Sequence, residues 1–224
     1  MKTIFYNMNF KFSLSEVLRI SIKELRLFLF VIGSFSYYFK LSFKAAKPMN
    51  ASKSLIYPMP KFFDRYIHIV REEDLMDALK NSLNLYLSMD FNLLEKIGTK
   101  TYETGKWTVK EILVHITDNE RIQSYRAMRF ARNDNTSLPG YDEALLASYS
   151  DANKRSLEDI KNEFFHVRNA SIELFKGLTK EAILRKGVCF NTEISALALG
   201  FVLVGHQEHH IKVIEGKYTE LALL

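Results

Sequence analysis

Three of the six histidines in this 224-residue chain lie within five positions, in the stretch VGHQEHHIKVI at residues 204–214. Successive residues of an α-helix turn by about 100°, so side chains four positions apart lie nearly above one another. His206 and His210 have that spacing, whereas His209 would lie about 80° from the centre of their stripe. Imidazole nitrogens are common ligands of zinc and similar divalent ions. The spacing therefore predicts that His206 and His210 bind a metal ion.

A third ligand has to come from another helix, and His115 is the candidate. It lies in the apolar stretch EILVHIT, inside a predicted helix over residues 108–133. It is about 10 Å from the start of that helix, while His206 and His210 lie about 15 Å and about 9 Å from the end of theirs. If the two helices are antiparallel, the three histidines share one layer. Three neutral imidazoles leave a coordination position open, which is typical of a catalytic metal site.

The same stretch excludes a zincin metalloprotease. In that motif a glutamate directly follows the first histidine of the pair and acts as the general base. Gln207 occupies this position here and cannot act as that base. Gly205, which precedes the pair, would let a neighbouring helix or a ligand approach closely because it has no side chain. The residues thus indicate a metal site without an obvious general base.

The elements that must position these histidines read as helices. Apolar spacing and capping signals predict four long helices, over residues 72–98, 108–133, 153–177 and 192–216. The second opens with a capping box formed by Thr108 and Glu111. No alternating pattern of useful length predicts a strand. These helices are the inventory of an all-α four-helix bundle, and the long link between the second and third predicts a crossover that leaves those two parallel.

Charge and cysteine content limit the partners. The net charge is +5, but residues 1–48 alone carry +6, so residues 49–224 are balanced at −1. That body lacks the overall basic field that binds a phosphate backbone, so we expect a small-molecule substrate and no nucleic acid. The single cysteine, Cys189, excludes an internal disulfide and is compatible with a cytoplasmic, reducing location. It is expected to be a packed side chain rather than a reactive thiol.

Residues 1–48 are expected to lie outside the core domain. Their uncharged run at residues 27–39 would cover about 20 Å as a helix, which is short of the roughly 30 Å hydrocarbon core of a bilayer. Three interpretations stay open: a weak membrane anchor, an amphipathic helix that begins at SLSE, residues 13–16, or a leader upstream of a true start at Met49. Apart from such an anchor, no membrane contact is expected.

The order of the motifs resembles that of the DinB-like superfamily, in the branch of the YfiT-type bacillithiol transferases. The matching stretches are KWTVKEILVHITDNERIQSYRAMRF, LPGYDE, RSLEDIKNEFFHVRNASIELFKGL and GHQEHHIKVI. The resemblance runs from about residue 62 to near Gly216. Residues 1–48 have no counterpart in it.

This resemblance implies an up-down-down-up four-helix bundle, often a homodimer, with His115, His206 and His210 holding a divalent metal, zinc or nickel in the first place. It implies a metal-dependent transferase that uses a low-molecular-weight thiol cosubstrate against a small electrophile. Two alternatives stay open. The first is a metal-dependent hydrolase that activates water, and the second is a non-catalytic stress protein that binds a metal or a small molecule.

Further positions near the predicted centre have two interpretations each. Asp118 and Asn119 could orient a ligand imidazole or simply line the mouth of a pocket. His209 could support the ligands or lie at the surface. Trp107 is expected to pack beside the start of the second helix. No catalytic residue beyond the ligands is assigned.

Overall fold

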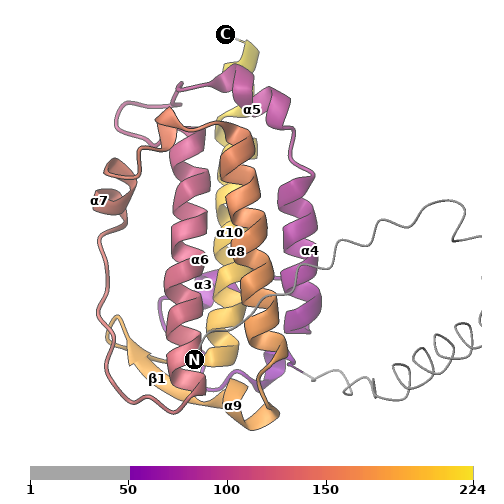
Figure 1. Ribbon diagram of the computed structural model, residues 1–224, viewed down its shortest axis with the longest axis vertical. Helices are drawn as coiled ribbons and strands as arrows, with labels where there is room; N and C mark the ends of the chain where they lie inside the picture. The colour runs from indigo at the N-terminus through magenta and orange to yellow at the C-terminus, as the bar shows by residue number, and fades with distance from the viewer. Residues whose placement is uncertain (1–50, 224) are drawn as a thin grey trace, which may run out of the picture. The chain divides into compact units, whose positions relative to one another are not determined.

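The computed structural model describes residues 51–223, and by its contacts the chain divides between Pro48 and Met49. The interpretations of residues 1–48 lie outside the described residues and stay predictions. Four long helices run side by side in the described unit (Figure 1). They are α4 (Leu75–Leu87), α6 (Val109–Ala131), α8 (Leu157–Lys176) and α10 (Ala196–Lys217). The predicted four-helix bundle is confirmed.

Helices α6 and α8 are parallel, as the long link between them predicts. Glu120 pairs with Arg168, and Ser124 is 2.9 Å from Ser171, so residue numbers rise in the same direction along both helices. The link returns along the outside of the bundle (Figure 1). It contains the short helix α7 (Glu143–Ser148) and the 3-10 turn η2 (Ala152–Lys154). Helices α4 and α10 run the opposite way (Figure 1), so the topology is up-down-down-up.

Helix α10 runs antiparallel to α6, which is the arrangement that the histidine depths require. Tyr218, directly after the end of α10, donates a hydrogen bond to the carbonyl of Trp107, just before the start of α6. Further into both helices, His206 lies beside His115. The N-cap Thr108 and Glu111 form the predicted capping box. This cap fixes where α6 begins and hence the depth of His115 in the bundle.

The first predicted helix, over residues 72–98, is wrong as a single element. The structure has two helices, α4 and α5 (Phe91–Ile97), because Asp90 caps a new helix through the N–H of Leu93 at 3.0 Å. Apolar spacing continues across the break, so periodicity alone does not detect it. The third helix likewise begins at Leu157, after its N-cap Ser156, and not at residue 153.

The expectation that there is no strand is also wrong, since a short hairpin precedes the fourth helix. Strands β1 (Lys186–Cys189) and β2 (Thr192–Ser195) pair antiparallel, and α10 begins only at Ala196. The two turn residues, Phe190 and Asn191, have φ of 50° and 57°, the left-handed pair of a tight hairpin turn. Each strand has four residues, too few for a recognisable alternation. The short helix α9 (Lys180–Leu184) leads into this hairpin.

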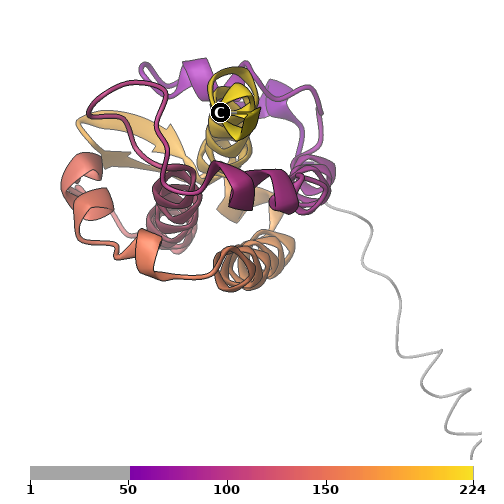
Figure 2. The ribbon, with the colours of Figure 1, turned by 90° about the horizontal axis from the view of Figure 1, so that it is seen from above.

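The hairpin is joined to the crossover link. Leu138 donates its N–H to the carbonyl of Val188 at 2.9 Å, and its own carbonyl accepts from the N–H of Phe190 at 3.2 Å. The N-terminal part of the described chain, with the turn η1 (Lys53–Leu55) and helix α3 (Asp64–Ile67), lies beside α10 (Figure 2). The link, the hairpin and α3 thus gather around one side of the bundle.

Gly205 is the reason that α3 can approach α10 closely. A Cβ atom at this position would overlap the carbonyl group of Tyr66. The predicted role of Gly205, to admit a neighbouring segment, is therefore confirmed. Because His206 follows directly, the side chains of Arg65 and Tyr66 come close to the predicted metal site.

A layer of buried polar side chains joins the four helices next to the predicted metal site. Arg168 is completely buried and donates two hydrogen bonds of 2.7 Å to the carboxylate of Glu120. It also donates to the carbonyl of Leu79 and to the hydroxyl of Ser82. The side-chain amide of Gln207 donates to the backbone carbonyl of Ser82 at 2.7 Å. Gln207 therefore anchors α10 to α4.

Within residues 51–223, no helix combines the length and apolar character needed to cross a bilayer.

Candidate metal centre

The structure brings His115, His206 and His210 together between α6 and α10. One ring nitrogen from each lies within 4.8 Å of the other two. The Nε2 atoms of His115 and His206 are 3.1 Å apart. The ring centroids are separated by 4.9 Å for His115 and His206, 4.9 Å for His115 and His210, and 4.6 Å for His206 and His210. The three side chains thus share one layer, as their depths in the two helices predict.

The environment keeps all three imidazoles neutral at pH 7. Burial lowers the pKa of His115 to about 4. Burial, with the neighbouring His115 and His209, lowers the pKa of His210 to about 3. Burial, followed by the charge of His210, holds the pKa of His206 well below 6.5. A neutral imidazole keeps the lone pair that a metal ligand needs. The donor set therefore fits a divalent ion of the zinc type, with three nitrogens and room for a further ligand.

Trp107 forms one wall of this centre. Its ring centroid lies 4.8 Å from that of His115 and 6.5 Å from that of His210. The side chain packs against the core beside the start of α6, as expected. A pocket of about 200 Å³ begins here and reaches the triad through His210, with Tyr102 and Tyr218 among its other walls.

The other predicted residues lie around the triad in different ways. His209 is exposed, with its ring 5.1 Å from that of His210 and 5.8 Å from that of Tyr66. Asp118 is half-buried and pairs with Arg121 at 3.4 Å. Their role in orienting the ligand imidazoles stays a prediction.

Asn119 lies on the wall of the second, larger pocket. Its Nδ2 donates to the hydroxyl of Tyr141 at 2.7 Å. Its Oδ1 is buried and has no hydrogen-bond partner among the described residues. Asn119 therefore lines a pocket beside His206, which was one of its two predicted interpretations.

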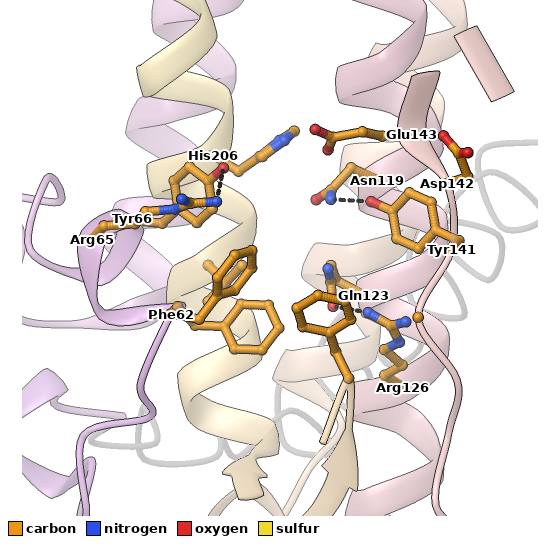
Figure 3. Close-up of a pocket in the computed structure, with 14 residues that line it drawn as sticks. Phe62, Arg65, Tyr66, Asn119, Gln123, Arg126, Tyr141, Asp142, Glu143 and His206 are labelled. Atoms are coloured by element: carbon orange, nitrogen blue, oxygen red, sulfur yellow. Dashed lines mark hydrogen bonds between the residues drawn. The ribbon is translucent and has the colours of Figure 1, made fainter. Parts of the chain in front are cut away.

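This larger pocket has a volume of about 270 Å³, and His206 is part of its lining. Figure 3 shows polar side chains of α6 on one side, with Asn119 above Gln123 and Arg126. Aromatic rings of Phe62 and Tyr66 lie on the other side (Figure 3). The pocket is thus a slot with one polar and one aromatic wall.

Three residues at the rim of the pocket, Arg65, Tyr66 and Glu143, carry functional groups that the sequence alone does not single out. Arg65 stands 4.1 Å from the ring centroid of Phe62 and donates to the hydroxyl of Tyr66 at 3.2 Å. Glu143 begins α7 and points into the pocket opposite Arg65 (Figure 3). The stretches FFDRYIHIV and LPGYDE contain these residues, but only the tertiary structure brings both stretches to the triad.

Cys189 is fully buried, and burial raises the pKa of its thiol. A raised pKa keeps the thiol protonated, which is the less reactive form. The expectation that Cys189 is a packed side chain is therefore confirmed.

Comparison with known proteins places the chain in a family. A family model described as the DinB superfamily matches residues 92–214, more than half of the chain. A protein of Oceanobacillus iheyensis, named "putative metal-dependent hydrolase", is 28% identical over 119 residues, which are 52% of this chain and 68% of that protein. The solved structure of YfiT from Bacillus subtilis is described as "a probable metal-dependent hydrolase with an unusual four-helix bundle topology". It matches with a TM-score of 0.50 at 19% identity, over 72% of this chain and 86% of that one, a likeness of fold. The chain belongs to the DinB superfamily.

Proposed function

We propose that this protein is a metal-dependent hydrolase of small molecules, with His115, His206 and His210 as the ligands of a divalent ion. The observation that carries the proposal is the cluster of three neutral ring nitrogens within 4.8 Å of one another at the edge of a pocket of about 270 Å³. The names given to the two similar proteins, "putative metal-dependent hydrolase" and "probable metal-dependent hydrolase", support the same reaction class. A zinc or nickel ion held there would supply Lewis acidity for attack of water on an ester or amide carbonyl.

The pocket offers a proton acceptor that the sequence around the histidine pair lacks. Glu143 reaches into the pocket that His206 lines (Figure 3). In our proposal its carboxylate accepts the proton of the attacking water. Arg65 and Tyr66 flank the reacting carbonyl, and the aromatic wall excludes bulk water from it.

A thiol transferase is the second candidate, and one observation favours it. The triad is reached by two pockets, one through His206 and one through His210. A reaction of two substrates, such as a low-molecular-weight thiol and an electrophile, would use both. The thiol would have to come from a cosubstrate, because the only cysteine is fully buried.

The metal content of purified protein tests the ligand set. We expect about one divalent ion per chain in the wild type and a large loss in His115→Ala, measured by elemental analysis after dialysis. His166→Ala is the matched control, since His166 is exposed on α8. Equal metal content in the wild type and His115→Ala would contradict the ligand set.

The reaction class is tested with a panel of small esters and amides, each assayed with and without an added low-molecular-weight thiol. Turnover without thiol that is lost in His206→Ala, and at least tenfold reduced in Glu143→Gln, supports the hydrolase. Turnover only with thiol would replace it by the transferase. A metal-loaded protein that is inert in both assays would point to a non-catalytic binding role.

A further inference from the structure

Arg126 is a buried cation in the wall of the pocket, and the described residues give it no anionic partner. Only 4% of the residue is exposed. Its guanidinium donates to Oε1 of Gln123 at 3.1 Å and to the carbonyl of Pro139 at 2.6 Å, both neutral acceptors. It also stands 5.6 Å from the ring centroid of Tyr141. No carboxylate of residues 51–223 lies within 4.0 Å of it.

Arg168, which is also deeply buried, does have a carboxylate partner. Arg168 forms a two-pronged pair with Glu120, with both hydrogen bonds at 2.7 Å. A buried charge without a counter-ion is costly, which is why such groups are normally paired. A guanidinium carries five N–H donors, and within the described part of the chain Arg126 forms two hydrogen bonds. The remaining donors are suited to a planar anion.

The neighbours of Arg126 extend this polar wall toward the metal centre. Asn119, Gln123 and Arg126 all line the pocket and lie on the same stripe of α6 as His115. Oδ1 of Asn119 is a buried acceptor with no partner among the described residues. Buried acceptors normally receive a hydrogen bond, so a donor of a bound ligand would satisfy it. The wall thus offers a cation at one end, amide groups in the middle and the triad at the other end.

The charges at the rim do not neutralise Arg126. In Figure 3, Asp142 and Glu143 lie at the opposite end of the pocket from Arg126, and Glu143 faces Arg65. The carboxylate of Asp142 accepts the N–H of Leu145 at 3.0 Å as the cap of α7. The positive end of the pocket therefore lies away from the acidic rim.

We propose that Arg126 makes this pocket a site for small carboxylate-bearing esters or amides, and the inference rests on the proposed hydrolase. The carboxylate of the substrate binds Arg126, its apolar or aromatic body lies against Phe62 and Phe190, and the bond to be broken reaches the triad. Arg126 lies eleven positions after His115, about 16 Å along the helix axis. The guanidinium of Arg126 donates to Gln123, three residues nearer the triad along α6, so it extends from its backbone toward the triad. The substrate is therefore elongated, with the carboxylate and the hydrolysable bond at opposite ends.

Binding of a matched pair of probes tests the anion site without reference to turnover. The probes are 3-(4-methoxyphenyl)propanoate and its carboxamide, which differ in charge and not in shape. By calorimetry on the full-length protein as purified, we expect the carboxylate to bind at least tenfold more tightly than the amide. This is the order of a charge-assisted hydrogen bond. Equal binding by the wild type would overturn the proposal, whatever any variant does. Tighter binding of inorganic phosphate than of the carboxylate would overturn the choice of anion.

Variants then test whether Arg126 causes the preference for the carboxylate over the carboxamide. In Arg126→Met the carboxylate should bind at least tenfold more weakly while the amide is unchanged, and Arg126→Lys should keep part of the preference. Arg132→Met is the control, because Arg132 is an exposed residue of the same segment that does not line the pocket. An unchanged preference in a folded Arg126→Met, checked by thermal melting, contradicts the site.

Hydrolysis of 3-(4-acetoxyphenyl)propanoate and its carboxamide separates the two proposals. Water breaks the ester bond of either probe, giving acetate and the phenol. Equal turnover of both compounds would leave the hydrolase standing and remove the anion site. A tenfold binding preference for the carboxylate without turnover of either would leave the anion site standing and remove the hydrolase.

Discussion

The three imidazoles are held in their neutral form because they are buried. In metal-free protein, this burial lowers the free energy of unfolding at low pH. His115 and His206 expose 4% and 3% of their surface. Burial disfavours the imidazolium, so protons must be forced onto these rings below the usual histidine range. The property that suits them to a divalent ion thus makes the metal-free fold sensitive to acid.

We predict that the unfolding free energy of metal-free protein falls as the pH drops from 6.5 toward about 4. The unfolded chain has an ordinary histidine pKa of 6.5, while burial lowers that of His115 to about 4. The unfolded state therefore binds more protons in this window, and stability rises with pH through it. For His115 alone the loss is on the order of 3 kcal/mol.

Urea unfolding in the presence of a chelator, at several pH values, measures this loss. His115→Gln should flatten the dependence, and His68→Ala, at an exposed position, should leave it unchanged. A stability that is constant between pH 6.5 and 4 would contradict the assigned burial effect.

At the level of elements, the site depends on how closely α3 approaches α10 and on the polar layer that joins the four helices. The first contact requires a glycine at position 205, since a side chain there would overlap Tyr66. The second depends on the pair of Arg168 and Glu120, with Gln207 attached through Ser82. Gly205 and Gln207 flank His206 directly on α10, so both contacts influence where the triad lies.

Gly205→Ala should destabilise the protein by about 1–3 kcal/mol, because the added methyl group displaces the backbone at Tyr66. Gly216→Ala is the matched control on the same helix, where no atom of residues 51–223 lies within 4 Å of the added Cβ. There the better helix propensity of alanine should stabilise by up to about 1 kcal/mol. Urea unfolding of both variants checks the signs, and a neutral Gly205→Ala would show that α3 can move away without loss.

Arg168→Met should cost about 3–5 kcal/mol, because it leaves the buried carboxylate of Glu120 without its partner. The double variant with Glu120→Leu should recover most of this loss, since it removes both buried charges. Glu173→Ala breaks the exposed pair with Lys176 and should change stability by less than about 1 kcal/mol. A double variant no more stable than Arg168→Met alone would show that the pair acts in another way.

At the level of the whole molecule, the core, the triad and both pockets belong to the unit that begins at Met49. The folded body thus contains every residue that the proposed chemistry uses. Residues 1–48 also differ in charge, since they carry +6 against −1 for the rest.

A chain that starts at Met49 should therefore keep the melting temperature, metal content and probe binding of the full chain. Side-by-side thermal melting, elemental analysis and calorimetry of the two proteins provide the check. Loss of the metal or of the fold in the shorter chain would assign a structural role to residues 1–48.

The sequence by itself determined which three histidines cluster, the helical class and the crossover, because these follow from local spacing and from link length. His206 and His210 are four residues apart on one helix, and the depth of His115 can be counted from its capping box. Local patterns do not detect the break at Asp90 or the four-residue strands, since a side-chain cap and a tight turn there override helical periodicity.

Only the tertiary structure decided what faces the triad. Arg65, Glu143 and Phe190 come from three segments far apart in the chain, and each depends on contacts that no local pattern records. Gly205 admits α3, and Leu138 joins the link to the hairpin. Among residues 51–223 no carboxylate pairs with the buried Arg126, and this too is a property of packing and not of spacing. Histidines that share one face of a helix can be predicted from the helical period, whereas a pocket built between distant segments cannot.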